Sequence, residues 1–307
     1  MTSDNLLLPS PLDRVWPIPQ AAALAILLEA TSFKVGNVHP TAGFRDMHLE
    51  HFLVAGTSLQ DVLKSVGPHS QVGAVVLECV QRCQQDVGTN TSLGTIILLA
   101  PLAIAKVRSS RRPLRASLAD LLRNLTPQDA RNIYLAIVES QAGGLGKQPK
   151  MDLREPAPDD LLDAMRAVAN TDAVARQYVN DFEDIFERLL PWLLAETSRG
   201  FSTRQAIART QIRWLAYEPD GLIVRKTGAD VASQVQQLAQ AASLELDETP
   251  TTYTASNVVQ QSLPLQSTTL LELDSFLRRD GNRCNPGTTA DLLAATVFTR
   301  LICGEIS

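Results

Sequence analysis

An acid, a lysine and a glycine occur together in the segment 29–40, which reads Glu-Ala-Thr-Ser-Phe-Lys-Val-Gly-Asn-Val-His-Pro. Glu29 closes a predicted helix, and Lys34, Gly36 and Asn37 lie in the turn beyond it, where exposed carbonyl groups and a flexible backbone can contact a ligand. Such a mixture suits a triphosphate or its metal ion. An alternative stays open, in which Glu29 and Lys34 are an ordinary solvated acid and base beside a glycine C-cap.

A second acid follows closely. Asp46 comes after Phe44 and directly before Met47, where a further helix is expected to begin. Its carboxylate could act at a site shared with the segment 29–40. The alternative is that Asp46 only caps the N-terminus of the helix starting at Met47.

A polar loop bracketed by glycines precedes the apolar run 95–105. Small and amide side chains just before a buried helix leave free N–H groups, which would attract an anion. In the alternative, Gly88 is a C-cap and Thr91 or Ser92 an N-cap, and no ligand is needed. The candidate residues here are Asp86, Gly88, Thr89, Asn90, Thr91 and Gly94.

Two late segments could also contact phosphate. Arg225 and Lys226 are adjacent cations between glycines, and Asp291 lies at a helix start, where it could act through a metal ion. Against this, Thr288 and Asp291 have the spacing of a capping box, and Arg225 with Lys226 could be a plain surface pair. The pattern alone leaves both interpretations open.

Two pairs have the spacing of metal ligands on a helix: His48 with His51, and Cys79 with Cys83. No third strong ligand follows either pair at a recognisable spacing. Histidines near carboxylates are common on a solvated helix face, and buried thiols are common in cores. Neither pair predicts a metal site.

The elements that position these residues are predicted to be helices. Val174, Tyr178, Phe182, Ile185 and Leu189 recur at spacings of three and four, which predicts one amphipathic helix there. Alternation at period two is nearly absent, so the fold is predicted to be all-α, a compact multi-helix bundle. Further helices are expected at 19–29, 47–63, 72–84, 93–106, 127–139, 161–168, 203–217, 229–242, 268–279 and 287–303.

At 307 residues and 45% hydrophobic content, the chain is long enough for one large core, and we expect a single domain over 1–307 with a surface loop or lid at 143–160. A net charge of −5 argues against proteins that coat nucleic acid or anionic membrane. We expect neither partner. The N-terminus lacks the pattern of a secretory signal, and the four cysteines make no disulfide framework. A cytoplasmic small-molecule enzyme fits best.

Taken in order, these motifs resemble the triphosphoribosyl-dephospho-CoA synthase family. The resemblance rests on the segment 29–40 with Asp46, the loop 88–94, the Arg225-Lys226 segment, and Pro286-Gly287 with Asp291. It runs over most of the chain and implies an all-helical protein. It also implies transfer of the triphosphoribosyl group of ATP to the ribose 2′-hydroxyl of 3′-dephospho-CoA, with release of adenine.

The resemblance implies roles for the candidate residues. Displacement at the anomeric carbon passes through an oxocarbenium-like state, so we expect Glu29 or Asp46 as the base or the sugar-facing carboxylate. Asp86 or Asp291 is expected beside Mg²⁺, which needs only one or two protein carboxylates when phosphate shares its coordination. Triphosphate would be neutralised by Lys34, Arg225 and Lys226 and bound by Gly36, Asn37, Gly88, Thr89, Asn90, Thr91 and Gly94.

One departure from the family pattern bears on the substrate. Val35 follows Lys34 where the citrate-lyase branch has Pro-Gly, and Asn37-Val38-His39-Pro40 fills the next positions. Another acceptor, for example in the assembly of pterin-type one-carbon cofactors, is therefore an alternative. A helical protein that binds nucleotide without chemistry is a second alternative. The sequence does not predict an oligomeric state.

Overall fold

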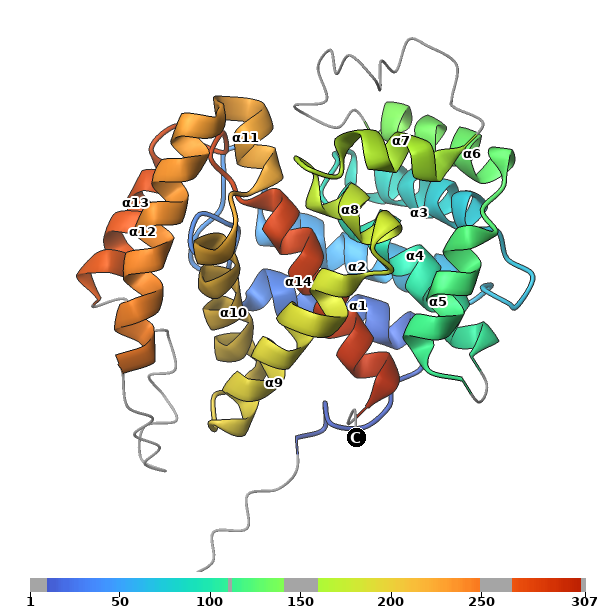
Figure 1. Ribbon diagram of the computed structural model, residues 1–307, viewed down its shortest axis with the longest axis horizontal. Helices are drawn as coiled ribbons and strands as arrows, with labels where there is room; N and C mark the ends of the chain where they lie inside the picture. Colours follow the sequence, from blue (N-terminus) through green and yellow to red (C-terminus); the bar gives the residue numbers. More distant parts are fainter. Residues whose placement is uncertain (1–9, 110–111, 141–159, 249–266, 305–307) are drawn as a thin grey trace, which may run out of the picture.

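The computed structural model describes residues 10–109, 112–140, 160–248 and 267–304. Over these residues the chain is helical, and its only β-type pairings are two isolated bridges in the loop after α1 (Figure 1). The all-α prediction is confirmed. The helices are α1 (Ile18–Thr31), α2 (Leu49–Leu63), α3 (Val72–Val87), α4 (Leu93–Arg108), α5 (Leu114–Arg123), α6 (Pro127–Glu139), α7 (Leu161–Val168), α8 (Ala173–Val179), the π-helix η1 (Asp184–Leu189), α9 (Leu190–Ser198), α10 (Thr203–Tyr217), α11 (Gly221–Thr227), α12 (Ala229–Glu248), α13 (Thr268–Arg278) and α14 (Gly287–Cys303).

Most predicted boundaries lie within a few residues of the observed ones, because the sequence carries the capping groups. Thr126 accepts from the backbone N–H of Asp129 at the start of α6, and the Asp129 carboxylate accepts from the N–H of Thr126. Gly88 ends α3 in the left-handed region, with φ of 76°, as a glycine C-cap does. Two short helices, α5 and α11, were not predicted.

The prediction of one continuous helix through residues 174–189 is wrong. The chain forms α8 and η1 there instead, and Asp181 and Phe182, which lie between these two helices, have positive φ values of 55° and 58°. Left-handed backbone is rare for a bulky side chain, but here it lets Phe182 enter the core completely. The hydrophobic spacing correctly predicted that most of these side chains are buried, but it did not predict that the helix is interrupted.

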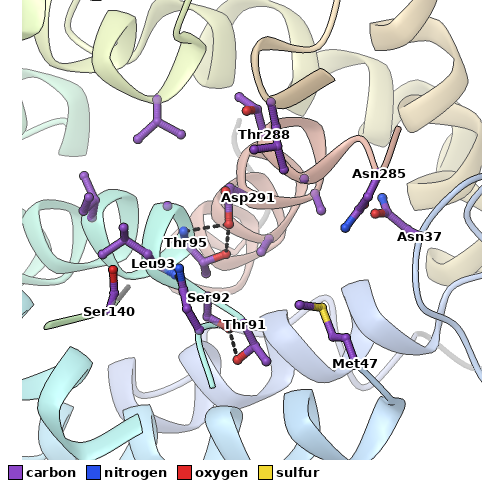
Figure 2. A pocket seen from close by; sticks show the side chains of 18 of the residues that line it. Asn37, Met47, Thr91, Ser92, Leu93, Thr95, Ser140, Asn285, Thr288 and Asp291 are labelled. Atoms are coloured by element: carbon purple, nitrogen blue, oxygen red, sulfur yellow. Dashed lines mark hydrogen bonds between the residues drawn. The ribbon is translucent and has the colours of Figure 1, made fainter. Parts of the chain in front are cut away.

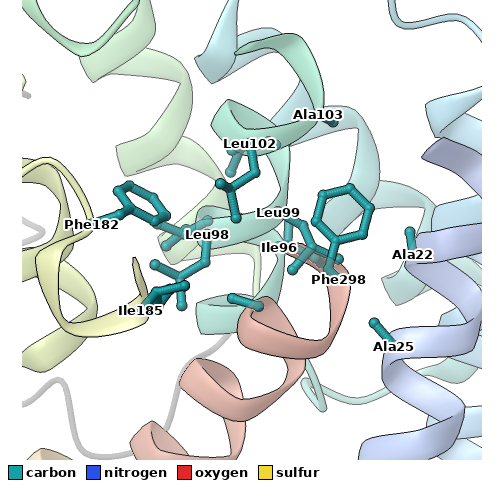
Figure 3. Packing of buried hydrophobic residues seen from close by; sticks show 14 of the residues in the cluster. Ala22, Ala25, Ile96, Leu98, Leu99, Leu102, Ala103, Phe182, Ile185 and Phe298 are labelled. Atoms are coloured by element: carbon teal, nitrogen blue, oxygen red, sulfur yellow. The ribbon is translucent and has the colours of Figure 1, made fainter. Parts of the chain in front are cut away.

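Helix α4 is the centre of the larger of two hydrophobic clusters. Leu98 and Leu102 of α4 belong to this cluster, as do Phe182 of the turn before η1 and Phe298 of α14 (Figure 3). Helix α1 adds small residues such as Ala22. Almost the whole of α4 is buried. The N-terminal turn of α4 is thus held rigidly by the core behind it.

The smaller cluster is formed by α10, α11, α12 and α13, which lie together on one side of the molecule (Figure 1). Its buried residues include Ile212, Ile223, Val235 and Leu273. Helix α10 also contributes Ile207 and Trp214 to the larger cluster. The two cores are therefore joined through α10.

A proline inside α4 is compensated by a tyrosine. Pro101 has no N–H and leaves the carbonyl of Ile97 without its helical partner. The hydroxyl of Tyr178, a fully buried residue of α8, donates to that carbonyl at 2.7 Å. This bond fixes α8 against the first turns of α4.

Two further predictions concern parts of the chain at or beyond its described limits. The expected loop or lid at 143–160 lies outside the described residues except for Asp160, which caps α7 by accepting from Leu162 and Asp163. None of the described helices combines the length and the hydrophobicity needed to cross a membrane.

Candidate active site

A cavity of about 410 Å³ opens where several helices begin. The N-terminal parts of α4 and α14 contribute Gly94, Thr95, Thr288 and Asp291 to its lining, and Figure 2 shows the last three around one space. Residues of α1, α8 and α11 also line the cavity, as do residues of α2, α3, α6 and α7. Because a helix carries partial positive charge at its N-terminus, this convergence favours an anion.

Asp291 of α14 joins two of these helix ends. Its Oδ1 accepts from the backbone N–H of Thr95 at 2.8 Å and from the Thr95 hydroxyl at 2.7 Å (Figure 2). Thr95 is in the first turn of α4, so Asp291 caps a helix other than its own. The capping box of Thr288 and Asp291, considered from the sequence, is therefore wrong, because this carboxylate points away from its own helix start.

Gly94 makes this arrangement possible. A Cβ at position 94 would lie 2.2 Å from Asp291 Oδ2, well inside van der Waals contact. No hydrogen-bond donor to Oδ2 is present among the described residues, which leaves that oxygen available to the cavity. Burial, with nearby Glu29 and Asp220, outweighs the two bonds from Thr95 and raises the pKa of Asp291 to about 7.

The end of α1 carries a buried ion pair. Glu29 Oε1 lies 3.1 Å from Lys34 Nζ, and both side chains are almost fully buried. Burial raises the pKa of Glu29 and lowers that of Lys34, while each charge opposes the shift of the other. Both residues line the cavity.

Lys34 has little left to offer a ligand. Its Nζ also donates to the carbonyls of Glu29 at 2.7 Å and Val38 at 3.1 Å, and its charge is paired with that of Glu29. The sequence suggested that Lys34 neutralises triphosphate. In the structure it ties the C-terminus of α1 to the loop that follows.

The rest of that loop is fastened to the smaller cluster. Gly36, with φ of 66°, donates its N–H to Asp274 Oδ1 at 2.7 Å and lies against Leu277, so it is held away from the cavity lining. Asn37 does line the cavity, where its amide donates to the carbonyl of Pro286 at 3.4 Å. The structure therefore gives Gly36 a packing position and Asn37 a position at the site.

The whole loop from Gly88 to Gly94 lines the cavity. Asn90 Oδ1 accepts from the N–H of Leu93 at 3.1 Å and so caps α4 in place of Ser92, whose hydroxyl donates to that of Thr91. In the described part of the chain, the backbone N–H of Gly94 has no hydrogen-bond partner, and the same is true of Thr288 in the first turn of α14. These two amides are donors available to an anion.

Polar side chains form the rim of the cavity. The side-chain amide of Asn282 donates to both carboxylate oxygens of Asp46, at 3.0 and 2.9 Å. The backbone carbonyl of Asn282 accepts from Lys226 Nζ at 3.4 Å. The interpretation of Asp46 as an N-cap is wrong, because α2 begins at Leu49 with His48 in the capping position. Partial burial lowers the pKa of Lys226, opposed mainly by the charge of Asp46.

A single buried acid sets the position of the two helices behind this rim. Asp220 Oδ1 accepts from the first-turn amides of α11, and Oδ2 accepts from the N–H and hydroxyl of Thr289 in α14, each at 2.7 Å. Arg225 and Lys226 belong to α11, the helix that Asp220 caps, and both line the cavity. Arg225 and Lys226 are thus not a plain surface pair.

One expected residue lies elsewhere. Asp86 is absent from the cavity lining, and its carboxylate accepts from Ser58 and Arg82, both at 2.7 Å, on the surface between α2 and α3. Among the described residues, no group of three or more His, Cys, Asp or Glu side chains is arranged to hold a metal ion. His51 accepts from the N–H of His48 at the start of α2, and Cys79 and Cys83 are core thiols.

Sequence reasoning missed Asp172, Asp220, Thr95 and Asn282. Asp172 and Asp220 each stand directly before a short helix, which is a readable N-cap signal. Their second oxygens reach partners far away in the sequence, and no local pattern shows that. Thr95 and Asn282 acquire their roles only through Asp291 and Asp46.

Comparison with known proteins gives a family match over nearly the whole chain. The family model described as CitG: ATP:dephospho-CoA triphosphoribosyl transferase matches residues 16–306. Among solved structures, the chain is similar to a crystal structure from Archaeoglobus fulgidus that carries a provisional assignment as a triphosphoribosyl-dephospho-CoA synthase. The two have a TM-score of 0.61 and 22% identity over 83% of this chain and 97% of the other, a likeness that concerns the fold. A search of curated proteins gave no match.

Proposed function

The chain belongs to the ATP:dephospho-CoA triphosphoribosyl transferase family, and from this we propose that the cavity at the starts of α4 and α14 holds ATP for transfer of its triphosphoribosyl group to dephospho-CoA. Moving that group from ATP breaks the bond between C1′ and adenine, so adenine is the second product. The observation that carries the placement is the convergence of two helix N-termini with free amides on a cavity that also contains Asp291, Arg225 and Lys226.

The triphosphate is assigned to the side of the cavity with positive potential. The amides of Gly94 and Thr288 belong to helix N-termini, and Arg225 and Lys226 of α11 line the same cavity. Asn90 and Thr91 add amide and hydroxyl groups from the loop before α4. Lys34 is assigned an indirect part, since its charge is paired with Glu29 and its ammonium donates to two carbonyls of the chain.

Two carboxylates are assigned to the chemistry. Asp291 presents Oδ2 to the cavity, and its pKa of about 7 suits a base that takes the proton of the accepting hydroxyl near neutral pH. Glu29, held by Lys34, faces the sugar, where a negative charge stabilises the oxocarbenium-like transition state. We assign the ribose 2′-hydroxyl of dephospho-CoA as the acceptor.

A magnesium ion fits this donor set as a companion of the nucleotide. Mg²⁺ keeps several waters and is bound by one or two carboxylates together with substrate phosphates, so it does not need a group of three protein ligands. Asp46, at the rim beside Lys226, would hold it. When bound, the ion would neutralise charge on the triphosphate.

We expect the reaction to occur in the cytoplasm, where the free thiols of the chain would stay reduced.

The test is to incubate the full chain with ATP, Mg²⁺ and dephospho-CoA, then to measure free adenine by chromatography and the CoA product by mass. Adenine together with dephospho-CoA enlarged by a triphosphoribosyl group is the expected result. Adenine without such a product would show that the acceptor is a compound other than dephospho-CoA. Binding of ATP without any adenine would overturn the proposal in favour of a nucleotide-binding protein.

A further inference from the structure

Arg225 is the only residue on the cavity rim with both a buried unpartnered donor and an ion pair, among the residues the structure describes. Its Nη1 lies 2.7 Å from Asp172 Oδ2, and its side chain is 14% exposed. Its Nε is buried and has no hydrogen-bond partner within the described residues. An unpaired buried donor is costly, and a guanidinium has five N–H groups in a fixed fork, so an acceptor from outside the chain would complete this one.

Asp172 divides its two oxygens between two helices. Oδ1 accepts from the N–H groups of Val174 and Ala175, at 2.9 and 3.1 Å, and so caps α8. Oδ2 is directed at Arg225 of α11. Since α8 packs in the larger cluster and α11 in the smaller one, Asp172 connects the two cores at the cavity.

The backbone around this contact is tightly packed. A Cβ at position 221 would lie 2.5 Å from the carbonyl oxygen of Thr171, so the start of α11 rests directly on the residue before Asp172. Asp220 fixes the same start from the other side through Thr289. The Cα of Arg225 is thus placed by its helix, and only its long side chain needs to be oriented.

We infer that Asp172 is a positioning residue for the proposed reaction: it holds the guanidinium of Arg225 so that Nε–H and the remaining Nη donors face the triphosphate of ATP. The inference rests on the proposed function. An arginine already held in place loses less conformational freedom when phosphate binds, and this gain offsets the negative charge nearby. Arg225 would contact substrate, and Asp172 would act through it.

The test uses Asp172→Asn. Asparagine caps a helix as well as aspartate, so α8 keeps its cap. Its other polar atom is an NH2 donor, which cannot accept from Arg225, so the hydrogen bond to the guanidinium is lost. The loss of one charge-assisted hydrogen bond corresponds to about a tenfold change or more. We expect KM for ATP in adenine release to rise about tenfold, with kcat changed much less and thermal unfolding unchanged.

The matched control is Asp160→Asn. Asp160 caps α7 through Leu162 and Asp163 just as Asp172 caps α8, but it is exposed and absent from the cavity lining. It should leave KM unchanged. If Asp172→Asn behaves like Asp160→Asn in an active enzyme, the inference is overturned while the proposed function stands. If the wild-type chain releases no adenine, the proposed function itself fails.

A double-mutant cycle with Arg225→Lys gives a second measurement. Lysine retains the charge but not the fork, so Arg225→Lys alone should also raise KM for ATP. Because both substitutions disturb the same guanidinium, the double variant should be little worse than either single one. Effects on KM that multiply would show that the residues act independently, and this outcome also overturns the inference.

Discussion

Asp291 of α14 caps α4 through Thr95, and the same carboxylate keeps its second oxygen for the cavity. A group that binds a helix end with one oxygen has a fixed orientation, because rotation would break both bonds to Thr95. The short side chain adds little freedom of its own. The site therefore has a carboxylate whose position is set by the core behind α4.

Substituting Gly94 by alanine should displace that carboxylate. The new Cβ would lie 2.2 Å from Oδ2 and 2.6 Å from Cγ of Asp291, so the side chain must leave Thr95. Since a shift of about 1 Å in a reacting group can cost about 100-fold in rate, we expect a loss of that order in kcat for adenine release. The matched control is Gly67→Ala, where a Cβ meets nothing within 4 Å. Equal rates for the two variants would contradict the role of Asp291.

The rate of adenine release should depend on the ionisation of Asp291. A base must be deprotonated, so kcat/KM is expected to fall as pH decreases through about 7, the value to which burial raises the pKa of this group. Thr95→Val removes one hydrogen bond that favours the ionised form, so the midpoint should move to higher pH. A pH–rate profile measures both. A midpoint that Thr95→Val leaves in place would assign the titration to another group.

Stability should respond to pH with the opposite sign. The folded pKa of Asp291 is above its unfolded value, so the folded state binds this proton more tightly. Its contribution to the free energy of unfolding is present at low pH and is lost as pH rises from about 4 to about 7. Denaturant titrations of the wild type and Asp291→Asn across this range would show the difference. The decrease attributed to Asp291 should be missing from the variant.

Glu29 and Asp46 should separate stability from catalysis. Glu29→Gln leaves Lys34 as a buried cation without its counter-charge, which costs on the order of 3–5 kcal/mol. Asp46 is exposed, and Asp46→Asn should change stability by only about 0.5 kcal/mol. Both variants should lose adenine release. Normal turnover by either one in the folded state would remove that residue from the mechanism.

Tyr178→Phe should destabilise the chain without touching the cavity chemistry directly. The carbonyl of Ile97, already deprived of a partner by Pro101, would then be buried and unpaired. The expected cost is about 1–3 kcal/mol in the free energy of unfolding. Tyr134→Phe is the control, since no hydrogen bond to the Tyr134 hydroxyl is present within the described residues. Similar unfolding midpoints for the two variants would contradict this account of α4.

The sequence predicted local features far better than the pairings between helices. Thr126 gave an accurate start for α6, because its capping bonds span only a few residues. Helix α3 continues to Val87, past the predicted end at Gln84. The break at Asp181 and Phe182 was missed, since its hydrophobic spacing is the same as that of a continuous helix. Tertiary packing decided that backbone conformation.

The candidate site shows the same limit. Glu29, Asn90 and Asp291 were found from residue type and position, and they share one cavity. Lys34 and Asp86 have the right chemistry for a ligand, but neighbours from distant or adjacent segments take up their polar groups. Whether a charged group is free depends on such partners. A pattern along the chain cannot count them.

Asp220 limits which residues the chain can accept at the junction of α11 and α14. One oxygen serves each helix, so an amide, with a single acceptor, could satisfy only one of them. Glutamate would place its oxygens one carbon farther out and miss both helix starts. Related sequences should therefore keep aspartate at position 220 even where the residues of the cavity differ to suit another acceptor substrate.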